Sequence, residues 1–374
     1  MIKAFQDIIN GRHDYARSWK ERTGGKVAGC FCTYVPEEML AAAGVLPVRI
    51  LGSLRPQELA EAHIPTMYCP YSRDCLSEGL EGTYGYLDGV VMAKACMHLQ
   101  QAYECWVLDV PTGYYHFITM PWILEDPESR AYFISELLDF KKTLEAWTGV
   151  PLTDEALERG IDLYNSHRRL MHSLYELRRP DPPLISGTEA AAIVLSSMLC
   201  DKAEHNELLA AAIEKAPGRM DPPGPAPRLM IAGGENYDLE LPLLVESLGA
   251  NVVIEEQCMG SRYFWNEVSG EGDRLGAIAD RYLTRPPCPT KTNQQPRYQH
   301  ILDLVRDYGV QGVLLIQQKF CSPHAVDIPD LTRFLSANGV PSYFFELDVT
   351  LARGQLRTRT EAFLETLGLG MELV

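Results

Sequence analysis

Two cysteines occupy matching places in the two halves of the chain. Cys321 comes shortly after the apolar run 313–316, and Cys96 comes shortly after the apolar run 89–93. Short apolar runs of this kind are typical of buried parallel strands. Ligands bind at the carboxyl ends of the strands in open α/β sheets. Both cysteines are therefore candidates for a binding or redox role at a sheet edge.

Two further cysteine pairs have spacings that could serve the same chemistry. Cys30 and Cys32 lie on a predicted strand over 26–32, where a spacing of two residues puts both side chains on one face. Cys69 opens a predicted helix that also carries Cys75. The amino end of a helix stabilises a thiolate. Thiolates that converge from two domains would suit an iron–sulfur cluster held in the cleft between them.

Zinc is the competing metal, and simple packing is the competing role for the cysteines. A structural zinc site draws its ligands in close pairs, which here only Cys30 and Cys32 supply. Buried free cysteine often acts as a small apolar residue, and this is the interpretation for Cys105 and Cys200. The sequence assigns no role to the remaining two cysteines, Cys258 and Cys288.

Two histidines follow the strand-end cysteines at short spacing. His98 lies two residues after Cys96, and His324 lies three residues after Cys321. A single histidine is more often structural than functional. A histidine after each of two strand ends is a candidate for positioning a ligand or handling protons. Glu37 and Glu38 are interpreted first as acidic residues that begin a helix.

Composition sets outer limits on function. The chain has 374 residues, enough for two or three domains, and a net charge of −16, which argues against binding to nucleic acid. It contains no apolar stretch near the roughly 20 residues that span a bilayer, and no signal peptide is recognisable. We therefore expect a cytoplasmic protein without a membrane segment, in which the ten cysteines are reduced thiols or metal ligands.

The alternation of predicted strands and helices divides the chain into four parts. Strands alternate with helices at both ends of the chain, which predicts parallel sheets. The middle shows helical periodicity without a convincing strand and is followed by a proline-rich linker. The predicted parts are an α/β domain over 1–127, a helical domain over 128–216, a linker over 217–227 and a second α/β domain over 228–374. The similar layout of the two α/β parts suggests an internal duplication.

Two predicted elements near the amino end bear on this layout. Residues 1–22 are predicted to form one amphipathic helix, and residues 106–110 are predicted to form a strand.

Nucleotide-binding loops are absent: the chain has no GxxxxGK[ST] motif, and Gly233-Gly234 lacks the third glycine of a dinucleotide fingerprint. We therefore do not expect the chain to hydrolyse ATP itself.

Several long motifs resemble one known family over nearly the whole chain. They are CTYVPEEMLAAAGVLPVRILG from Cys32, CPYSRDCLSEGLEGTYGYLDGVV from Cys69, GSRYFWNEV, IQQKFCSPHAVDIPDL, FFELDVT and GQLRTRTEAF. The chain is identified by them as a member of the benzoyl-CoA reductase and 2-hydroxyacyl-CoA dehydratase family. Within this family, it resembles the smaller cluster-bearing catalytic subunit of the ATP-dependent benzoyl-CoA reductases.

The resemblance implies a fold and a cofactor. The fold would be α/β, with two flavodoxin-like parallel-sheet domains and an inserted helical domain. A 4Fe–4S cluster would lie between the domains, held by three cysteines that match the family's motifs as Cys69, Cys96 and Cys321. Cys32 stands where some relatives have a small polar residue, so it is either a fourth ligand or part of the wall of the site.

The resemblance also implies a reaction and partners. A separate ATP-hydrolysing subunit would supply single electrons of low potential, and a second cluster-bearing catalytic subunit would complete the enzyme. The cluster would pass electrons to an acyl-CoA substrate, and benzoyl-CoA would be reduced to a cyclic diene. His98, His324 or an acidic residue would deliver protons. Tyr263, Phe264 and Trp265 would either wall an aromatic substrate pocket or be ordinary core residues.

Three alternatives to this function stay open at the level of sequence. The same scaffold could dehydrate a 2-hydroxyacyl-CoA by a radical mechanism. It could be a non-catalytic electron-relay subunit whose partner binds the substrate. It could also be a structural protein that holds zinc or no metal at all.

Overall fold

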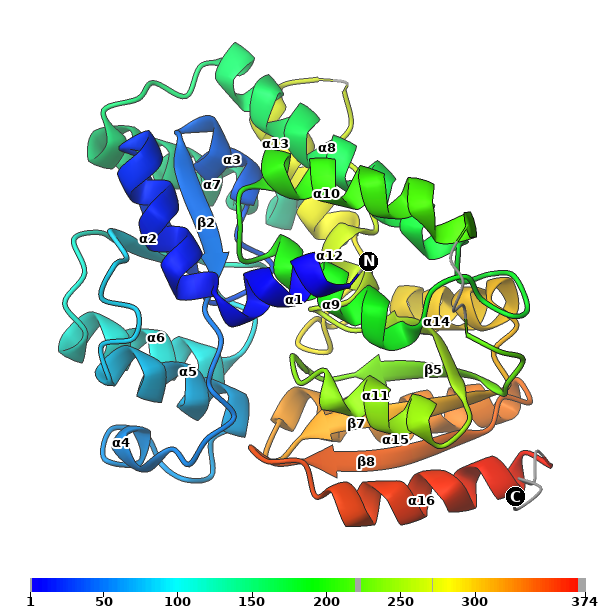
Figure 1. The fold of residues 1–374 in the computed structure, drawn as a ribbon. Helices are drawn as coiled ribbons and strands as arrows, with labels where there is room; N and C mark the ends of the chain where they lie inside the picture. Colours follow the sequence, from blue (N-terminus) through cyan, green and yellow to red (C-terminus); the bar gives the residue numbers. More distant parts are fainter. Residues whose placement is uncertain (1, 219–222, 271, 369–374) are drawn as a thin grey trace.

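The computed structural model describes residues 2–218, 223–270 and 272–368, and it contains two four-stranded parallel sheets (Figure 1). The first sheet has the strand order β2-β1-β3-β4 and the second has the order β6-β5-β7-β8. The strands of the first sheet are β1 (Lys26–Cys30), β2 (Val45–Arg49), β3 (Gly89–Ala93) and β4 (Tyr115–Ile118). Those of the second are β5 (Arg228–Gly233), β6 (Asn251–Glu256), β7 (Gly312–Gln318) and β8 (Ser342–Leu347). The predicted α/β fold with two parallel-sheet domains is confirmed.

The two sheets share one topology. In each, the first strand of the sheet in sequence lies between the second and the third, so the chain reverses direction across the sheet after its second strand. This is the flavodoxin-like order, and its reversal point, between β1 and β3 or between β5 and β7, is where ligands bind in such sheets. The repeated order supports an internal duplication of the layout.

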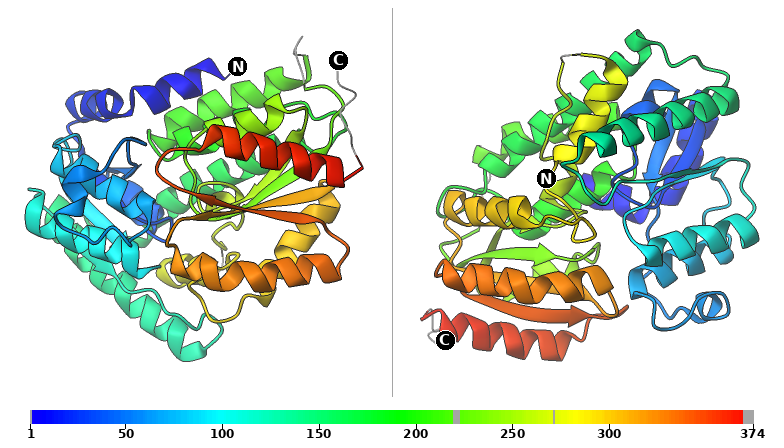
Figure 2. Two further views of the ribbon diagram at one scale, coloured as in Figure 1. Left: turned by 90° about the horizontal axis from the view of Figure 1, so that it is seen from below. Right: turned by 180° about the vertical axis from the view of Figure 1, so that it is seen from behind.

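Helices cover both faces of the second sheet (Figure 2). Along β5, Leu229 and Ile231 pack with α11 (Glu240–Ser247) and α16 (Arg353–Thr366), while Met230 and Ala232 belong to the larger core on the other face. That other face is covered by α14 (Gln295–Asp307) and α15 (Ser322–Ala337). A strand buried on both faces explains why the sequence shows a continuous apolar run here.

The edge of the first sheet differs from its prediction. Residues 106–110 do not form a strand, because α6 (Met97–Asp109) continues through them and the edge strand is β4. Trp106 is fully buried while Leu108 is exposed, which is the pattern of a helix face. A short apolar run does not distinguish a strand from a buried helix segment.

The amino end also differs from the prediction of one helix. Two helices, α1 (Lys3–Asn10) and α2 (Arg12–Thr23), meet at Gly11. In the view of Figure 1 they lie above α5 (Pro70–Leu80) and α6. The other helices of this domain are α3 (Glu37–Ala42) and α4 (Glu58–Glu61).

Four helices and a short 3-10 turn fill the middle of the chain. They are α7 (Pro127–Thr148), α8 (Asp154–Glu176), α9 (Gly187–Ser197), α10 (Lys202–Lys215) and η1 (Ala216–Gly218). α8 packs against α3 of the first domain, and α9 packs against α11 of the second. The helices thus bridge the two sheets. The predicted linker over 217–227 lies partly outside the described residues.

The second domain carries two further helices before α14. These are α12 (Ser261–Phe264) and α13 (Arg274–Thr284), and α13 packs against α7 of the helical part. Within the described ranges, none of the helices has the length and apolar character needed to cross a membrane.

Gly160 lets α8 approach α3 closely. A Cβ atom at this position would lie 2.3 Å from the backbone oxygen of Glu38, and backbone cannot move aside as a flexible side chain can. We expect Gly160→Ala to lower the free energy of unfolding by about 1–3 kcal/mol, the usual cost of overpacking. Denaturation in urea measures this. Gly354→Ala is the matched control, because a Cβ atom there would have no other atom within 4 Å. Equal stability of both variants would contradict the close approach.

Candidate functional site

Six cysteines line one cavity at the carboxyl ends of the two sheets. The cavity has about 600 Å³ of empty space, including the part open to solvent, and other lining residues include Tyr34, Tyr71, Glu235 and His324. The cysteines are Cys32, Cys69, Cys96, Cys258, Cys288 and Cys321. The structure therefore brings all four of the predicted ligand residues together and adds two that the sequence did not single out.

Cys69, Cys96 and Cys321 occupy equivalent positions at the amino ends of three helices. They are the N-cap residues of α5, α6 and α15. The backbone N–H of Leu99 donates to Cys96 Sγ at 3.5 Å, whereas in the described structure Cys69 Sγ and Cys321 Sγ accept no such cap hydrogen bond. Cys96 Sγ thus takes the place of the usual cap oxygen, and all three cysteines stand at the positive end of a helix dipole.

Burial nevertheless dominates the ionisation of these three thiols. It raises the pKa of each one, while the helix amides act in the opposite direction. Without a cation, the thiols therefore stay protonated near neutral pH. A bound metal would deprotonate them outright, because its charge replaces the lost solvation. The three helix ends are thus prepared to hold thiolates once a metal supplies the positive charge.

The two predicted histidines lie beside this group in different ways. His98 Nδ1 accepts a hydrogen bond from the backbone N–H of Cys69 at 3.1 Å, which fixes the loop before α5. His324 lines the cavity, and burial lowers its pKa well below the ordinary value. Its Nδ1 atom has no hydrogen-bond partner among the described residues. At neutral pH the His324 ring is therefore uncharged.

Cys32 reaches the cavity because β1 ends earlier than predicted. The strand stops at Cys30, so the expected arrangement of Cys30 and Cys32 on one strand face is wrong. Cys32 lines the cavity, whereas Cys30 is buried in the core. The loop between them turns the second sulfur toward the sheet edge.

Cys258 and Cys288 were missed by the sequence analysis. Cys258 lies two residues beyond β6, the same offset at which Cys32 follows β1, so the strand-end pattern could have revealed it. Cys288 lies in the connection between α13 and α14 and carries no such signal. The two thiols are hydrogen-bonded to each other, and the Cys258 thiol lowers the pKa of Cys288 by donating to it.

Four buried cations surround this second group of thiols. Arg49 Nη2 donates to Glu235 Oε1 at 2.9 Å, and Arg262 pairs with Glu256 at the same distance. Arg285 and Lys291 lie on the Tyr34 ring, 4.5 Å and 5.2 Å from its centroid. All four side chains are almost fully buried. Their positive charge makes this wall of the cavity favourable for anions.

The predicted aromatic residues do not reach the cavity. Tyr263 Oη donates to Glu37 Oε2 at 2.5 Å and accepts from Lys202 Nζ at 2.8 Å. Phe264 packs against Tyr175, with their ring centroids 4.8 Å apart. Trp265 accepts a hydrogen bond from His172 through its backbone oxygen. Their proposed role as walls of a substrate pocket stays a prediction, and the aromatic rings in contact with the cavity are Tyr34 and Tyr71.

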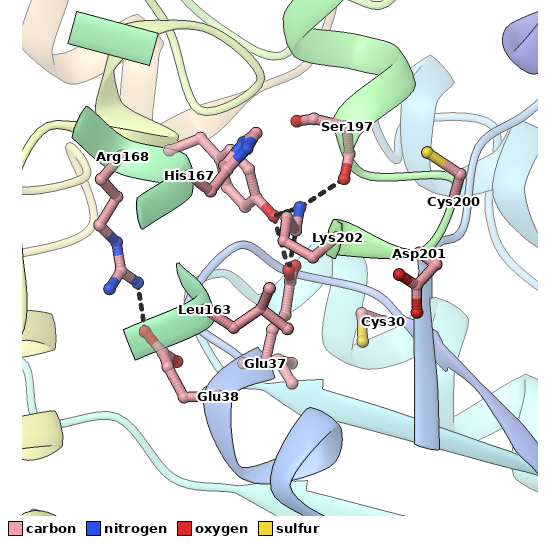
Figure 3. Close-up of polar contacts among 12 residues, drawn as sticks. Cys30, Glu37, Glu38, Leu163, His167, Arg168, Ser197, Cys200, Asp201 and Lys202 are labelled. Atoms are coloured by element: carbon pink, nitrogen blue, oxygen red, sulfur yellow. Dashed lines mark hydrogen bonds and ion pairs between the residues drawn. The ribbon is translucent and has the colours of Figure 1, made fainter. Parts of the chain in front are cut away.

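A buried charged cluster lies under the loop that carries Cys32. Figure 3 shows Lys202 between Glu37 and Ser197, with the Glu38–Arg168 ion pair beside it. Glu37 and Glu38 begin α3 as predicted. They are also buried, which the sequence did not indicate. Because buried charges are costly unless paired, these contacts hold the start of α3 in one position.

The side chains that line the cavity fit a metal cluster and not a single metal ion. Among the described residues, no three His, Cys, Asp or Glu side chains form a group able to hold one metal ion. A cluster differs in this respect, since each thiolate bonds a separate iron atom and the ligands stand farther apart. Six thiols, with buried arginine N–H donors that lack acceptors in the described structure, fit an anionic iron–sulfur group.

The chain is an α/β protein whose two parallel sheets meet at their carboxyl ends around a cavity lined by thiols. Over residues 32–367, the chain matches the family described as 2-hydroxyglutaryl-CoA dehydratase, D-component, and it belongs to that family. The resemblance inferred from the motifs is therefore confirmed. The family comprises subunits of 2-hydroxyacyl-CoA dehydratases and benzoyl-CoA reductases.

Three relatives illustrate the range of the family. The (R)-phenyllactyl-CoA dehydratase beta subunit of Clostridium sporogenes is 25% identical, covering 97% of each chain. A benzoyl-CoA reductase subunit of Thauera aromatica is 28% identical, covering 88% of each chain. The putative dehydratase subunit YjiM of Escherichia coli (strain K12) is 30% identical, covering 93% of each chain.

His205, beside the Lys202 cluster, makes a testable contribution to pH-dependent stability. Burial lowers its pKa from 6.5 to about 3. The unfolded chain therefore binds a proton below pH 6.5 that the folded protein does not bind. This lowers the free energy of unfolding by about 2 kcal/mol at pH 5 relative to neutral pH. Urea unfolding at both pH values should show a smaller decrease in His205→Gln than in the unsubstituted protein. Equal decreases would contradict the shift.

Proposed function

We propose that this chain is the iron–sulfur subunit of an enzyme that reduces an acyl-CoA by single-electron steps. Cys69, Cys96 and Cys321 would hold a 4Fe–4S cluster. The observation that carries the proposal is that these three cysteines cap three helices and line one cavity between two sheets. Three equivalent caps at one site are not explained by packing alone.

The chemistry divides between the cluster and the protein. When bound, a 4Fe–4S cluster supplies single-electron transfer at a potential set by its surroundings. The helix amides would hold the ligating sulfurs in place and donate hydrogen bonds to them. The apolar lining, which includes Leu99 and Pro323, would limit access of water to the cluster.

Proton delivery is assigned to groups at the rim and wall of the cavity. His324 lines the cavity, and its Nδ1 atom has no partner in the described parts of the chain, so this atom would exchange a proton with the substrate there. His98 keeps its Nδ1 engaged with the Cys69 amide. It would therefore position the ligand loop first, with only Nε2 left to exchange a proton.

Partner subunits follow from what the chain lacks and from the names of its relatives. The sequence contains no nucleotide-binding loop of the P-loop type. A separate ATP-hydrolysing subunit, which the family resemblance implies, would supply the low-potential electrons. Relatives are named as single subunits of dehydratases or reductases, and a second cluster-bearing subunit would complete the enzyme here.

Benzoyl-CoA or a related aromatic acyl-CoA is the proposed substrate. Its ring would take up electrons and protons in equal number and become a cyclic diene, with the activating subunit as the reductant. Dehydration of a 2-hydroxyacyl-CoA is the second candidate, favoured by the dehydratase names among the relatives. In a third arrangement the chain would relay electrons to a partner that binds the substrate.

Removal of any one proposed ligand should lower the cluster content. We expect Cys69→Ser, Cys96→Ser and Cys321→Ser each to lose most of the iron assigned to this cluster after anaerobic purification, because serine is a poor ligand for iron. Iron and sulfide analysis measures the loss. Cys105→Ser is the control, since Cys105 does not line the cavity. Full iron content in the Cys321 variant would refute the assignment.

The substrate class is tested with the complete enzyme complex. The anaerobically activated complex is incubated with benzoyl-CoA and, separately, with a 2-hydroxyacyl-CoA. We expect consumption of benzoyl-CoA with formation of a diene, followed by liquid chromatography and mass spectrometry. Turnover of the hydroxyacyl thioester alone would reject the reductase and establish the dehydratase.

A further inference from the structure

The cavity contains more thiols than one cluster can use. A single 4Fe–4S cluster binds four cysteine thiolates at most, yet six cysteines line this cavity. The remaining four cysteines of the chain, Cys30, Cys75, Cys105 and Cys200, are buried elsewhere. Packing alone would not explain why the cysteines that one cluster cannot bind line the same cavity.

The six thiols form two groups of three. Cys96 lies within electrostatic range of both Cys69 and Cys321, and all three cap helices. The members of the second group are Cys32, Cys258 and Cys288. Within it, Cys258 and Cys288 are hydrogen-bonded and Cys32 interacts with Cys288.

The two groups take their members from the two α/β parts in opposite proportions. The first group takes two members from the amino-terminal α/β part and one from the carboxyl-terminal part. The second group takes one from the amino-terminal part, Cys32, and two from the carboxyl-terminal part. Cys288 also interacts with Cys96 and Cys321, so it lies where the two groups meet.

Buried positive charge identifies what the second group would bind. Arg285 donates to the backbone oxygen of Thr33, and Lys291 donates to that of Pro121. Neither cation forms an ion pair with a carboxylate in the described parts of the chain. Arg49 interacts with Cys32, and Arg262 interacts with Cys258 and Cys288.

Some of these donors also lack acceptors. Arg49 Nη1 and Arg262 Nη1 are buried and have no hydrogen-bond partner among the described residues. A buried donor without a partner costs about 1–3 kcal/mol. An anion beside the second group would accept these hydrogen bonds and offset the charge. Thiolates together with inorganic sulfide provide such an anion.

We propose that Cys32, Cys258 and Cys288 bind a second iron–sulfur unit of the 4Fe–4S type, so that the cavity holds two units side by side. This proposal rests on the first cluster of the proposed function. It assigns Cys32 to the second unit and not to the fourth position of the first. Arg49, Arg262, Arg285 and Lys291 compensate the charge of the second unit.

Metal stoichiometry tests the second unit without any activity measurement. The protein is purified or reconstituted anaerobically, and its iron and acid-labile sulfide are measured per chain. We expect roughly eight irons in the unsubstituted protein and roughly four in the double variant Cys258→Ser/Cys288→Ser, since each unit of this type holds four. The double variant Cys105→Ser/Cys200→Ser is the matched control and should keep roughly eight.

The results separate this proposal from the proposed function. Roughly four irons in the unsubstituted protein, all retained by the Cys258→Ser/Cys288→Ser variant, would overturn the second unit and leave the first intact. Loss of all iron from a folded variant would show one unit shared by both groups and would also overturn it. An iron-free unsubstituted protein would overturn both proposals.

A second measurement avoids dependence on the folding of the variant. The unsubstituted holoprotein is alkylated with iodoacetamide before and after iron is removed by a chelator, and the modified cysteines are identified by mass spectrometry. We expect Cys258 and Cys288 to be protected in the holoprotein and modified after iron removal. Modification of both in the iron-loaded protein would overturn the proposal.

Discussion

Buried polar contacts between the two α/β parts hold the cavity together. Arg49, the last residue of β2, pairs with Glu235 just beyond β5 at 2.9 Å, and Tyr237 donates to Asp74 at 2.5 Å. Tyr282 adds a contact to Glu38 at 2.9 Å. Because thiols come from both sheets, the distance between their edges decides whether the ligand groups can form. These contacts fix that distance, and their burial makes separation costly, since breaking a buried pair leaves an uncompensated charge.

The same constraint explains the unusual density of buried charge around the site. Glu37, Glu38, Arg168 and Lys202 are all buried close to the loop that carries Cys32. Apolar residues could fill this space with a gain in stability. Ion pairs and hydrogen bonds have directional geometry, so they define the path of the Cys32 loop more narrowly than apolar packing would. The loop between β1 and α3 thereby gains a fixed conformation without regular structure.

Much of the fold could be predicted from the sequence, because most of its strands are almost fully buried and appear as apolar runs. The helical middle follows from the helical periodicity of that segment, and the flavodoxin-like strand order follows from the family resemblance. The predicted strand over 106–110 is wrong because its apolar residues fit both a strand and a helix that contacts the core.

The candidate site was predictable only in part, and for a physical reason. Cys69, Cys96 and Cys321 follow from local patterns of strand ends, helix starts and family motifs. Cys288 has no local pattern, and only the path of the chain between α13 and α14 brings it to the cavity. The contacts of Tyr263 with Glu37 and Lys202 join three distant segments, so no sequence pattern could place its ring away from the cavity.

The division of each thiol group between the two sheets has a consequence for the order of biogenesis. Neither α/β part alone presents three thiols of one group, so a nascent chain would complete the second group only at Cys288 and the first only at Cys321. Iron captured earlier would be bound incompletely and would exchange readily. Insertion of metal would therefore follow docking of the two halves, and it would then act as a clamp that resists their separation.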